Sequence, residues 1–273
     1  MDWSKSKTIF IVVFLILNVF LYTQYLDVYK QSKQVEQIGE KTIEAKLKDE
    51  NITYITLPTN VDDIAYISGR IRNFTEEDLP KNATIEPIIV DDYTIEAMLK
   101  SPFKLKSLEE ENVFAEFLQT NVFEGTNYVL WEINEEEQYA LFFQKLNGQT
   151  LYYNANGFLK LYWNDELEIT KYEQTMLEKI EDEDLQKRQN AFLPLQVLQA
   201  LYSKDLLPPD SRVTSMNLGY STLVQLTQTQ VFTPTWEVRV RTSDGQIKEH
   251  FVNAVEGTII DLEVSASEFE ELD

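Results

Sequence analysis

The chain has 273 residues, with 24 Lys plus Arg, 46 Asp plus Glu, one His and no Cys, which gives a formal net charge of −22. This length allows one large domain or two small ones, and 43% hydrophobic residues supply enough apolar side chains for folded cores. The negative charge argues against a nucleic-acid binder, which needs basic patches to neutralise phosphates. The lack of Cys excludes disulfides, Cys nucleophiles and Cys-ligated zinc, and a single His argues against His-based metal sites and Ser-His-Asp catalysis.

The first predicted element is a membrane anchor at residues 8–26. This stretch, TIFIVVFLILNVFLYTQYL, carries no charge and is long enough to cross the core of a bilayer. No small-residue cleavage site follows it, so the pattern is typical of an uncleaved signal anchor rather than of a signal peptide. Lys5 and Lys7 precede the stretch, and the positive-inside rule then places residues 1–7 in the cytoplasm and the C-terminal region outside. Residues 27–273 carry a net charge of −23, so the acidity belongs to the extracytoplasmic part.

Asn18 is the only strongly polar residue in the middle of this stretch. A side-chain amide at that depth can hydrogen-bond to a neighbouring helix, for about 0.5–2 kcal/mol. The alternative is that a single Asn is tolerated facing lipid or its own backbone.

Residues 27–50 are predicted to form a juxtamembrane stalk, either flexible or helical. The near-helical spacing of Val35, Ile38, Ile43 and Leu47 favours a helix. Residues 51–184 are predicted to form a first α+β module. Its strands are indicated by short apolar runs that Pro, Gly and Asn residues separate. These runs lie at residues 52–57, 64–71, 85–90, 128–133, 139–146, 151–153 and 158–163.

Two helices are predicted within the first module. The first begins at Ser107, which forms an S-x-x-E capping box with Glu110. Its apolar face consists of Phe114, Phe117, Leu118 and Val122. The second helix is expected at the charge-rich residues 173–184, which contain no Gly or Pro and would link the two modules. Between the helices, Asn147-Gly148 predicts a tight hairpin turn with positive φ angles.

Residues 185–273 are predicted to form a second α+β module with an acidic tail. Pro194 suits the first position of a helix, whose apolar stripe is Leu195, Leu198, Leu201 and Tyr202. Apolar and charged residues alternate over 236–241, which predicts a half-buried strand. Asp244-Gly245 then predicts a turn into a strand at 250–254, and Gly257 precedes a further strand at 259–264.

The two modules share a local pattern. Gly148-Gln149 with Tyr153-Asn154-Ala155 and Gly157 parallels Gly245-Gln246 with Val252-Asn253-Ala254 and Gly257, which suggests an internal repeat. The stretch PTWEVRVRTSDGQIKEHFVNAVEGTIIDLEV resembles the hairpin of PepSY domains, although Asn253 stands where that family prefers Asp. The PepSY resemblance implies a binding or inhibitory module outside the membrane rather than an enzyme.

The N-terminal sequence MDWSKSKTIFIVVFLILNVFL resembles the opening of the YycI (WalI) family, and the likeness continues to the VNAVEG ending. This resemblance implies a single-pass membrane protein of Gram-positive bacteria. It also implies that the protein associates with a YycH-type anchored protein and modulates a WalK-type sensor histidine kinase, which controls cell-wall homeostasis. By the same resemblance, the kinase would contact the span, and the residues chosen for that surface are Phe14, Leu17, Asn18 and Leu21.

The sequence offers little chemistry to an enzyme. His250 lies in a predicted strand with no identifiable catalytic partner. The acidic clusters at 62–63, 91–92, 109–111 and 135–137 lack the spacing of a calcium loop and fit solvated loops and helix N-termini. No nucleophile elbow, Walker A or dinucleotide motif is present. We therefore expect no catalytic residue, metal or cofactor.

The leading hypothesis is a non-enzymatic, membrane-anchored regulator of a sensor kinase that acts through its span and its extracytoplasmic part. The alternative is an anchored extracytoplasmic module, PepSY-like and inhibitory or serving envelope assembly, that uses the span only as a tether. A membrane-tethered hydrolase is a third and more distant possibility, because paired carboxylates are inevitable among so many acids.

Overall fold

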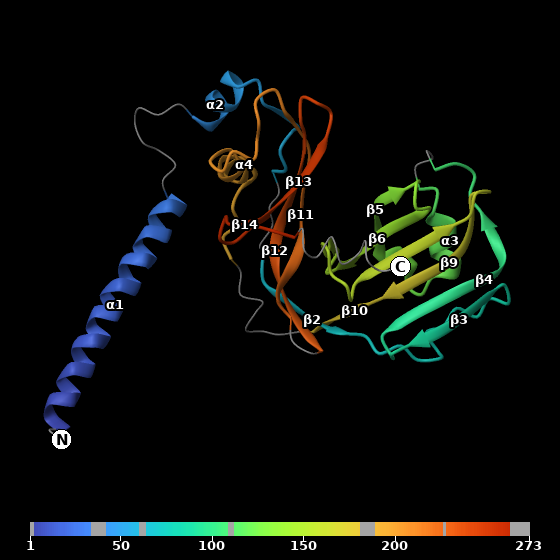
Figure 1. The fold of residues 1–273 in the computed structure, drawn as a ribbon, viewed down its shortest axis with the longest axis horizontal. Helices are drawn as coiled ribbons and strands as arrows, with labels where there is room; N and C mark the ends of the chain where they lie inside the picture. Colours follow the sequence, from blue (N-terminus) through green and yellow to red (C-terminus); the bar gives the residue numbers. More distant parts are fainter. Residues whose placement is uncertain are drawn as a thin grey trace. The chain divides into compact units, whose positions relative to one another are not determined.

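The computed structural model describes residues 3–33, 42–59, 64–108, 112–180, 189–225 and 228–262. The chain divides into two compact units, Met1–Glu50 and Asn51–Asp273. The described residues form helices and two β-sheets, which confirms the predicted α+β class (Figure 1).

The first unit contains α1 (Trp3–Lys33) and α2 (Ile43–Asp49). No Gly or Pro interrupts α1, which allows one continuous helix. Within the described residues, no helix combines the length and the apolar character that crossing a bilayer requires, so the span at 8–26 stays a prediction. The two helices cover parts of the predicted stalk at 27–50, while residues 34–41 lie outside the described residues.

The first sheet has the strand order β3-β4-β9-β8-β6-β5, with the short β7 paired to β6, and all of these pairs are antiparallel. The tight turn between β6 and β7 has positive φ at Asn147 and Gly148, as predicted. The bounds are β3 Ile85–Val90, β4 Thr94–Lys104, β5 Tyr128–Asn134, β6 Tyr139–Leu146, β7 Gln149–Thr150, β8 Phe158–Trp163 and β9 Glu168–Thr175.

The second sheet has the strand order β1-β11-β12-β13-β14, and β2 pairs with both β12 and β10. Only β1 and β11 run parallel among these pairs. Strands from residues 53–71 and 177–180 therefore complete a sheet that is built mainly from the last part of the chain. The bounds are β1 Thr53–Tyr54, β2 Ile67–Ile71, β10 Leu177–Ile180, β11 Arg212–Gln225, β12 Thr229–Arg241, β13 Ile247–Asn253 and β14 Ile259–Ile260.

The helix predicted at residues 173–184 is wrong for its described part, since β9 and β10 occupy residues 173–175 and 177–180. Its charges are compatible with a strand because they alternate with buried residues. Tyr172 and Gln174 are fully buried, whereas Glu173 lies on the other face of β9, beside Lys171. Pairing with β4 on one side and β8 on the other outweighs the helical preference of the isolated segment. Residues 181–184 lie outside the described residues.

Helix α3 (Ala115–Asn121) begins later than predicted. Phe114 is its N-cap and makes no side-chain capping bond, so Ser107 does not start the helix, and Glu110 lies outside the described residues. The predicted apolar face is nevertheless buried, with Phe117 at 0% exposure. Tyr172 Oη donates to Asn121 O at 2.9 Å, and this bond holds the end of α3 against the sheet.

The two faces of the first sheet are covered by different elements. On β6, Ala140 and Phe142 point into the core shared with α3, while Leu141 and Phe143 point into a cluster that includes Phe251 of β13.

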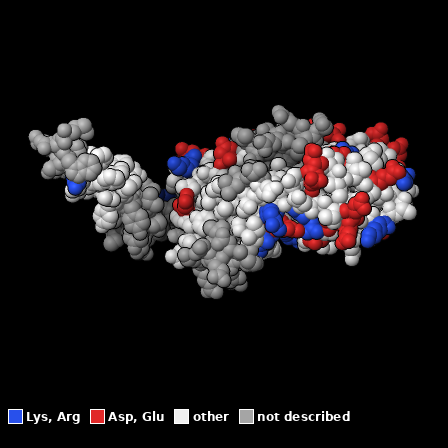
Figure 2. Space-filling model, turned by 90° about the horizontal axis from the view of Figure 1, so that it is seen from below, with Lys and Arg blue, Asp and Glu red and all other residues white. Residues whose placement is uncertain are grey.

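Helix α4 (Pro194–Tyr202) begins at Pro194, as predicted, and its Val197, Leu198 and Leu201 are fully buried. On the face shown in Figure 2, Lys and Arg side chains lie next to Asp and Glu rather than forming a basic stripe.

Candidate functional site

One candidate surface is a face of α1. Its side chains form a shallow open groove, and they recur at the one- and four-residue steps that place residues on one side of a helix. Phe14 and Asn18, two of the predicted contact residues, line this groove, whereas Leu17 and Leu21 lie beside it on the adjoining stripe of the helix. The lining residues are Phe10, Ile11, Phe14, Leu15, Asn18, Val19 and Tyr22.

The exposure of this face is unusual for a water-soluble helix. Phe14 is 59% exposed, Leu17 45% and Leu21 54%. A run of large apolar side chains in water marks a surface that another protein or a lipid phase covers. Val12 and Ile16 on the opposite side of α1 are 50% and 62% exposed, so the exposure marks the whole helix rather than this face, and the role of the predicted residues in binding a partner stays a prediction.

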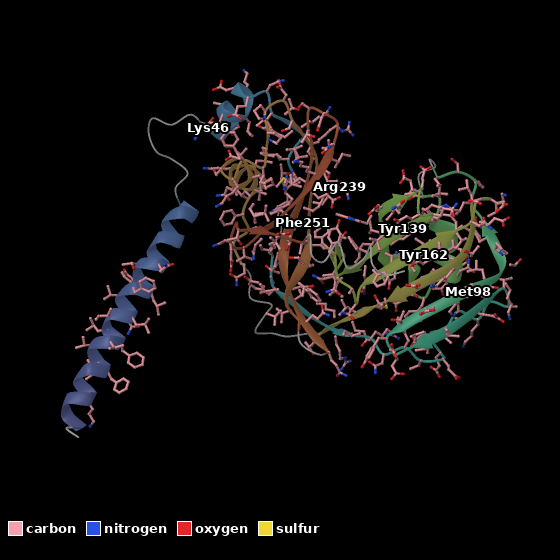
Figure 3. All side chains as sticks on the ribbon, viewed as in Figure 1. Lys46, Met98, Tyr139, Tyr162, Arg239 and Phe251 are labelled. Carbon is pink, nitrogen blue, oxygen red and sulfur yellow. The ribbon has the colours of Figure 1, made fainter. Side chains whose placement is uncertain are left out.

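A second candidate lies inside the second unit, at the junction where β5 and the loop after β7 meet β12 and β13. Aromatic rings pack there within short distances of one another, and they belong to Trp131, Phe143, Tyr152, Tyr153 and Phe251. Trp131 lies 5.0 Å from Phe143, and Tyr152 lies 5.3 Å from Phe251, measured between ring centroids. Figure 3 labels Phe251 and Arg239 on the sheet that contributes one side of this junction.

Charged side chains complete the junction. The guanidinium of Arg239 lies 4.4 Å from the centre of the Trp131 ring, a cation–π arrangement. Arg239 Nε pairs with Glu237 Oε1 at 2.8 Å, and Arg239 Nη2 pairs with Glu249 Oε1 at 3.2 Å. One arginine therefore binds a carboxylate on its own strand, a carboxylate on the next strand and an aromatic ring from the other sheet.

Glu237 and Glu249 differ in their surroundings. The Glu237 side chain is 1% exposed and also accepts a hydrogen bond from Asn217 Nδ2 at 3.0 Å. The Glu249 side chain is 26% exposed and accepts a bond from Tyr153 Oη at 2.9 Å. Trp131 Nε1 donates to the same Tyr153 Oη at 3.0 Å, so the polar chain runs from the first sheet to the second.

Burial shifts the titration of these groups. It raises the pKa of Glu249, and the attraction of Arg239 and the bond from Tyr153 offset only part of that rise. Burial also raises the pKa of the Tyr152 and Tyr153 hydroxyls, so both stay protonated at neutral pH. The junction thus contains one arginine between carboxylates of unlike exposure.

Sequence reasoning missed this junction. The alternation over 236–241 predicts that Glu237 and Arg239 face water, but the first sheet covers that side of β12 as well. The available signal was the cross-strand placement of opposite charges, because Arg239 and Glu249 are direct partners in the β12–β13 register.

The residues considered for catalysis do not converge on a site. The ring of His250 is bonded to the backbone of Leu206, and burial lowers its pKa. Asp91 and Asp92 lie in the β3–β4 turn with positive φ, and residues 135–137 lie in the β5–β6 turn. Among the described residues, no group of three or more His, Asp and Glu is placed to hold a metal ion. The acidic clusters at 62–63 and 109–111 lie outside the described residues.

Comparison with known proteins identifies a family. The family model described as "YycI protein" matches residues 30–255. No curated protein matches. Among solved structures, the chain is similar to an uncharacterized protein from Eubacterium rectale ATCC 33656, with 10% identity and a TM-score of 0.46, over 77% of this chain and 91% of that one.

Proposed function

Because the chain belongs to the YycI family, we propose that it is a non-enzymatic, membrane-anchored regulator of a WalK-type sensor histidine kinase. The YycI family is a regulatory family of the WalK/WalR two-component system and is associated with the membrane in that context. The observation that carries the proposal is the family match over residues 30–255, which covers most of the second unit.

The anchor in this proposal is α1, with residues 1–7 in the cytoplasm and the C-terminal region outside. Two features support it. Residues 8–26 carry no charge, and the large apolar side chains from Phe10 to Tyr22 stand 45–65% exposed along the described helix. Lys5 and Lys7 on the N-terminal side favour this orientation. The family match begins at residue 30, so the anchor rests on these physical features.

The contact surface in this proposal is the stripe of Phe14, Leu17, Asn18 and Leu21. Apolar packing alone gives little specificity between helices in lipid, because lipid tails are equally apolar. An amide among apolar neighbours supplies a directional bond to a helix of the kinase. The second unit pairs with a YycH-type anchored partner, and coupling to the kinase requires that partner binding differ between two kinase states.

Exchanging the anchor tests the mechanism. Residues 8–26 are replaced by a scrambled apolar 19-mer of the same composition, and co-purification with the kinase and output of the regulated genes are measured. We expect both to be lost while membrane insertion is retained. Unchanged association and signalling would refute contact through the helix and would favour the tether alternative, in which an inhibitory or envelope-assembly module, PepSY-like in its second half, acts alone.

A further inference from the structure

The Glu249 carboxylate joins the two sheets of the second unit. It belongs to β13, where Arg239 is its direct cross-strand partner at 3.2 Å. Its other oxygen accepts a bond from Tyr153, which belongs to the loop between β7 and β8. Removing the charge of Glu249 therefore acts on both sheets at once.

One arginine and two other carboxylates act electrostatically on the Glu249 carboxylate. Glu237 shares the guanidinium of Arg239 and lies two residues away from it on β12. Glu132 of β5 repels Glu249 from the opposite sheet, the Tyr153 hydroxyl hydrogen-bonds to it, and the charge of Glu249 acts in turn on the Tyr152 hydroxyl. Of the two carboxylates that bind Arg239, Glu249 is the more exposed and can exchange protons with solvent more readily.

We propose that Glu249 is a proton-binding switch at the junction of the two sheets. Proton uptake as pH falls neutralises Glu249 and leaves Arg239 paired with Glu237 alone. The protonated carboxyl keeps a hydrogen bond with the Tyr153 hydroxyl, in which either oxygen now donates. Arg239 then settles closer to Glu237, which changes its position over the Trp131 ring.

The energetics allow this change without unfolding. Burial raises the pKa of Glu249, and repulsion from Glu237 and Glu132 acts in the same direction. The folded chain therefore binds this proton more readily than the unfolded chain does. The contribution of Glu249 to stability rises as pH falls through its folded pKa, so protonation of this group does not by itself unfold the chain.

The position of Arg239 is transmitted to the other sheet because its guanidinium stacks on Trp131. Trp131 in turn donates to Tyr153, so a shift of the arginine changes the surroundings of the indole. This inference concerns the second unit alone and does not depend on the anchor or on a kinase partner.

Tryptophan fluorescence of the full chain in detergent tests the switch as pH is lowered from neutral, with far-UV circular dichroism followed in parallel. We expect a fluorescence transition centred above 4.5, the ordinary glutamate value, without loss of secondary structure. Trp131→Phe should remove the transition, because Trp131 reports it. Glu249→Gln should hold the signal in its acid form at every pH, and Glu256→Gln, which changes an exposed residue, should leave the transition in place.

A wild-type chain with no transition above the ordinary glutamate value would overturn the proposal. A transition that persists in Glu249→Gln would assign it to another group and would overturn the proposal equally. If Glu249→Gln does not fold, Glu249→Asp takes its place, because a shorter carboxylate should shift the midpoint or abolish the transition. An unshifted midpoint in Glu249→Asp would count against Glu249.

Discussion

Replacing Arg239 with Ala should destabilise the second unit strongly. Glu237 is 1% exposed and would keep only the bond from Asn217, so its charge would be buried without a cation. Breaking such a pair from one side costs about 3–5 kcal/mol. The Arg239 side chain is 31% exposed, so water can enter the space that it leaves and solvate part of the Glu237 charge. The lower end of this range of free energies therefore applies. With the lost cation–π contact included, we expect a loss of about 4 kcal/mol.

Urea unfolding of the full chain in detergent, followed by far-UV circular dichroism, measures this loss. Arg241→Ala is the matched control, because Arg241 lies on the same strand and is exposed, and it should change stability by less than about 0.5 kcal/mol. The double variant Glu237→Met with Arg239→Met removes both charges and should lose less than Arg239→Ala does. The reasoning is refuted if Arg239→Ala costs under about 1 kcal/mol, or if the double variant is the less stable of the two.

Three further predictions concern contacts elsewhere in the second unit. Gly219→Ala should cost about 1–3 kcal/mol in urea unfolding, because the added Cβ would lie 2.4 Å from Thr150 O; wild-type stability would contradict this close approach. Gln144→Ala should cost about 2 kcal/mol in the same assay, since the side chain bonds both Leu177 N and Leu177 O at 2.8 Å; a loss below about 0.5 kcal/mol would contradict it. Burial alone would raise the pKa of Asp78, but hydrogen bonds from Thr75 and Arg72 lower it overall. Asp78→Asn should therefore reduce stability at neutral pH, with the difference shrinking as pH falls through the lowered pKa, and a difference independent of pH would refute this.

The predictable parts of the fold are those where a local pattern and the final environment agree. β3, β6 and β8 lie at their predicted positions, or within one residue of them, because each is a compact apolar run bounded by turn residues. β6 is buried on both faces, which explains why its sequence YALFFQKL opens with five consecutive residues that are apolar or aromatic.

The structure differs from the predictions, or goes beyond them, where a segment depends on residues far away in the sequence. β11 was not predicted from the sequence. Gly219 lies in its middle, and a glycine weakens the interior of a strand. The structure explains the glycine at this position by close packing, because Thr150 and Tyr152 approach its backbone and leave no room for a Cβ atom. In the same way, the burial of Glu237 depends on packing against the first sheet. The residues of that sheet lie about a hundred positions earlier in the sequence, so no local pattern reveals this contact.

Of the two candidate sites, the face of α1 was predictable because a single helix places all of its residues. The periodicity of α1 places Phe14, Leu17, Asn18 and Leu21 on one face from sequence alone, and the groove that contains two of them follows from the same geometry. The junction around Arg239 could not be found in this way, because its members come from β5, β6, β12, β13 and a loop.

Photo-cross-linking from α1 tests the central claim most directly. The chain has no Cys, so a single Cys introduced in turn at positions 14, 17, 18 and 21 carries a photoreactive label at one known place. Val12 and Ile16 lie on the opposite side of the helix and are matched control positions. The account predicts cross-links to the sensor kinase in membranes from the first four positions and not from the two controls. Equal cross-linking around the helix, or none to the kinase, would contradict it.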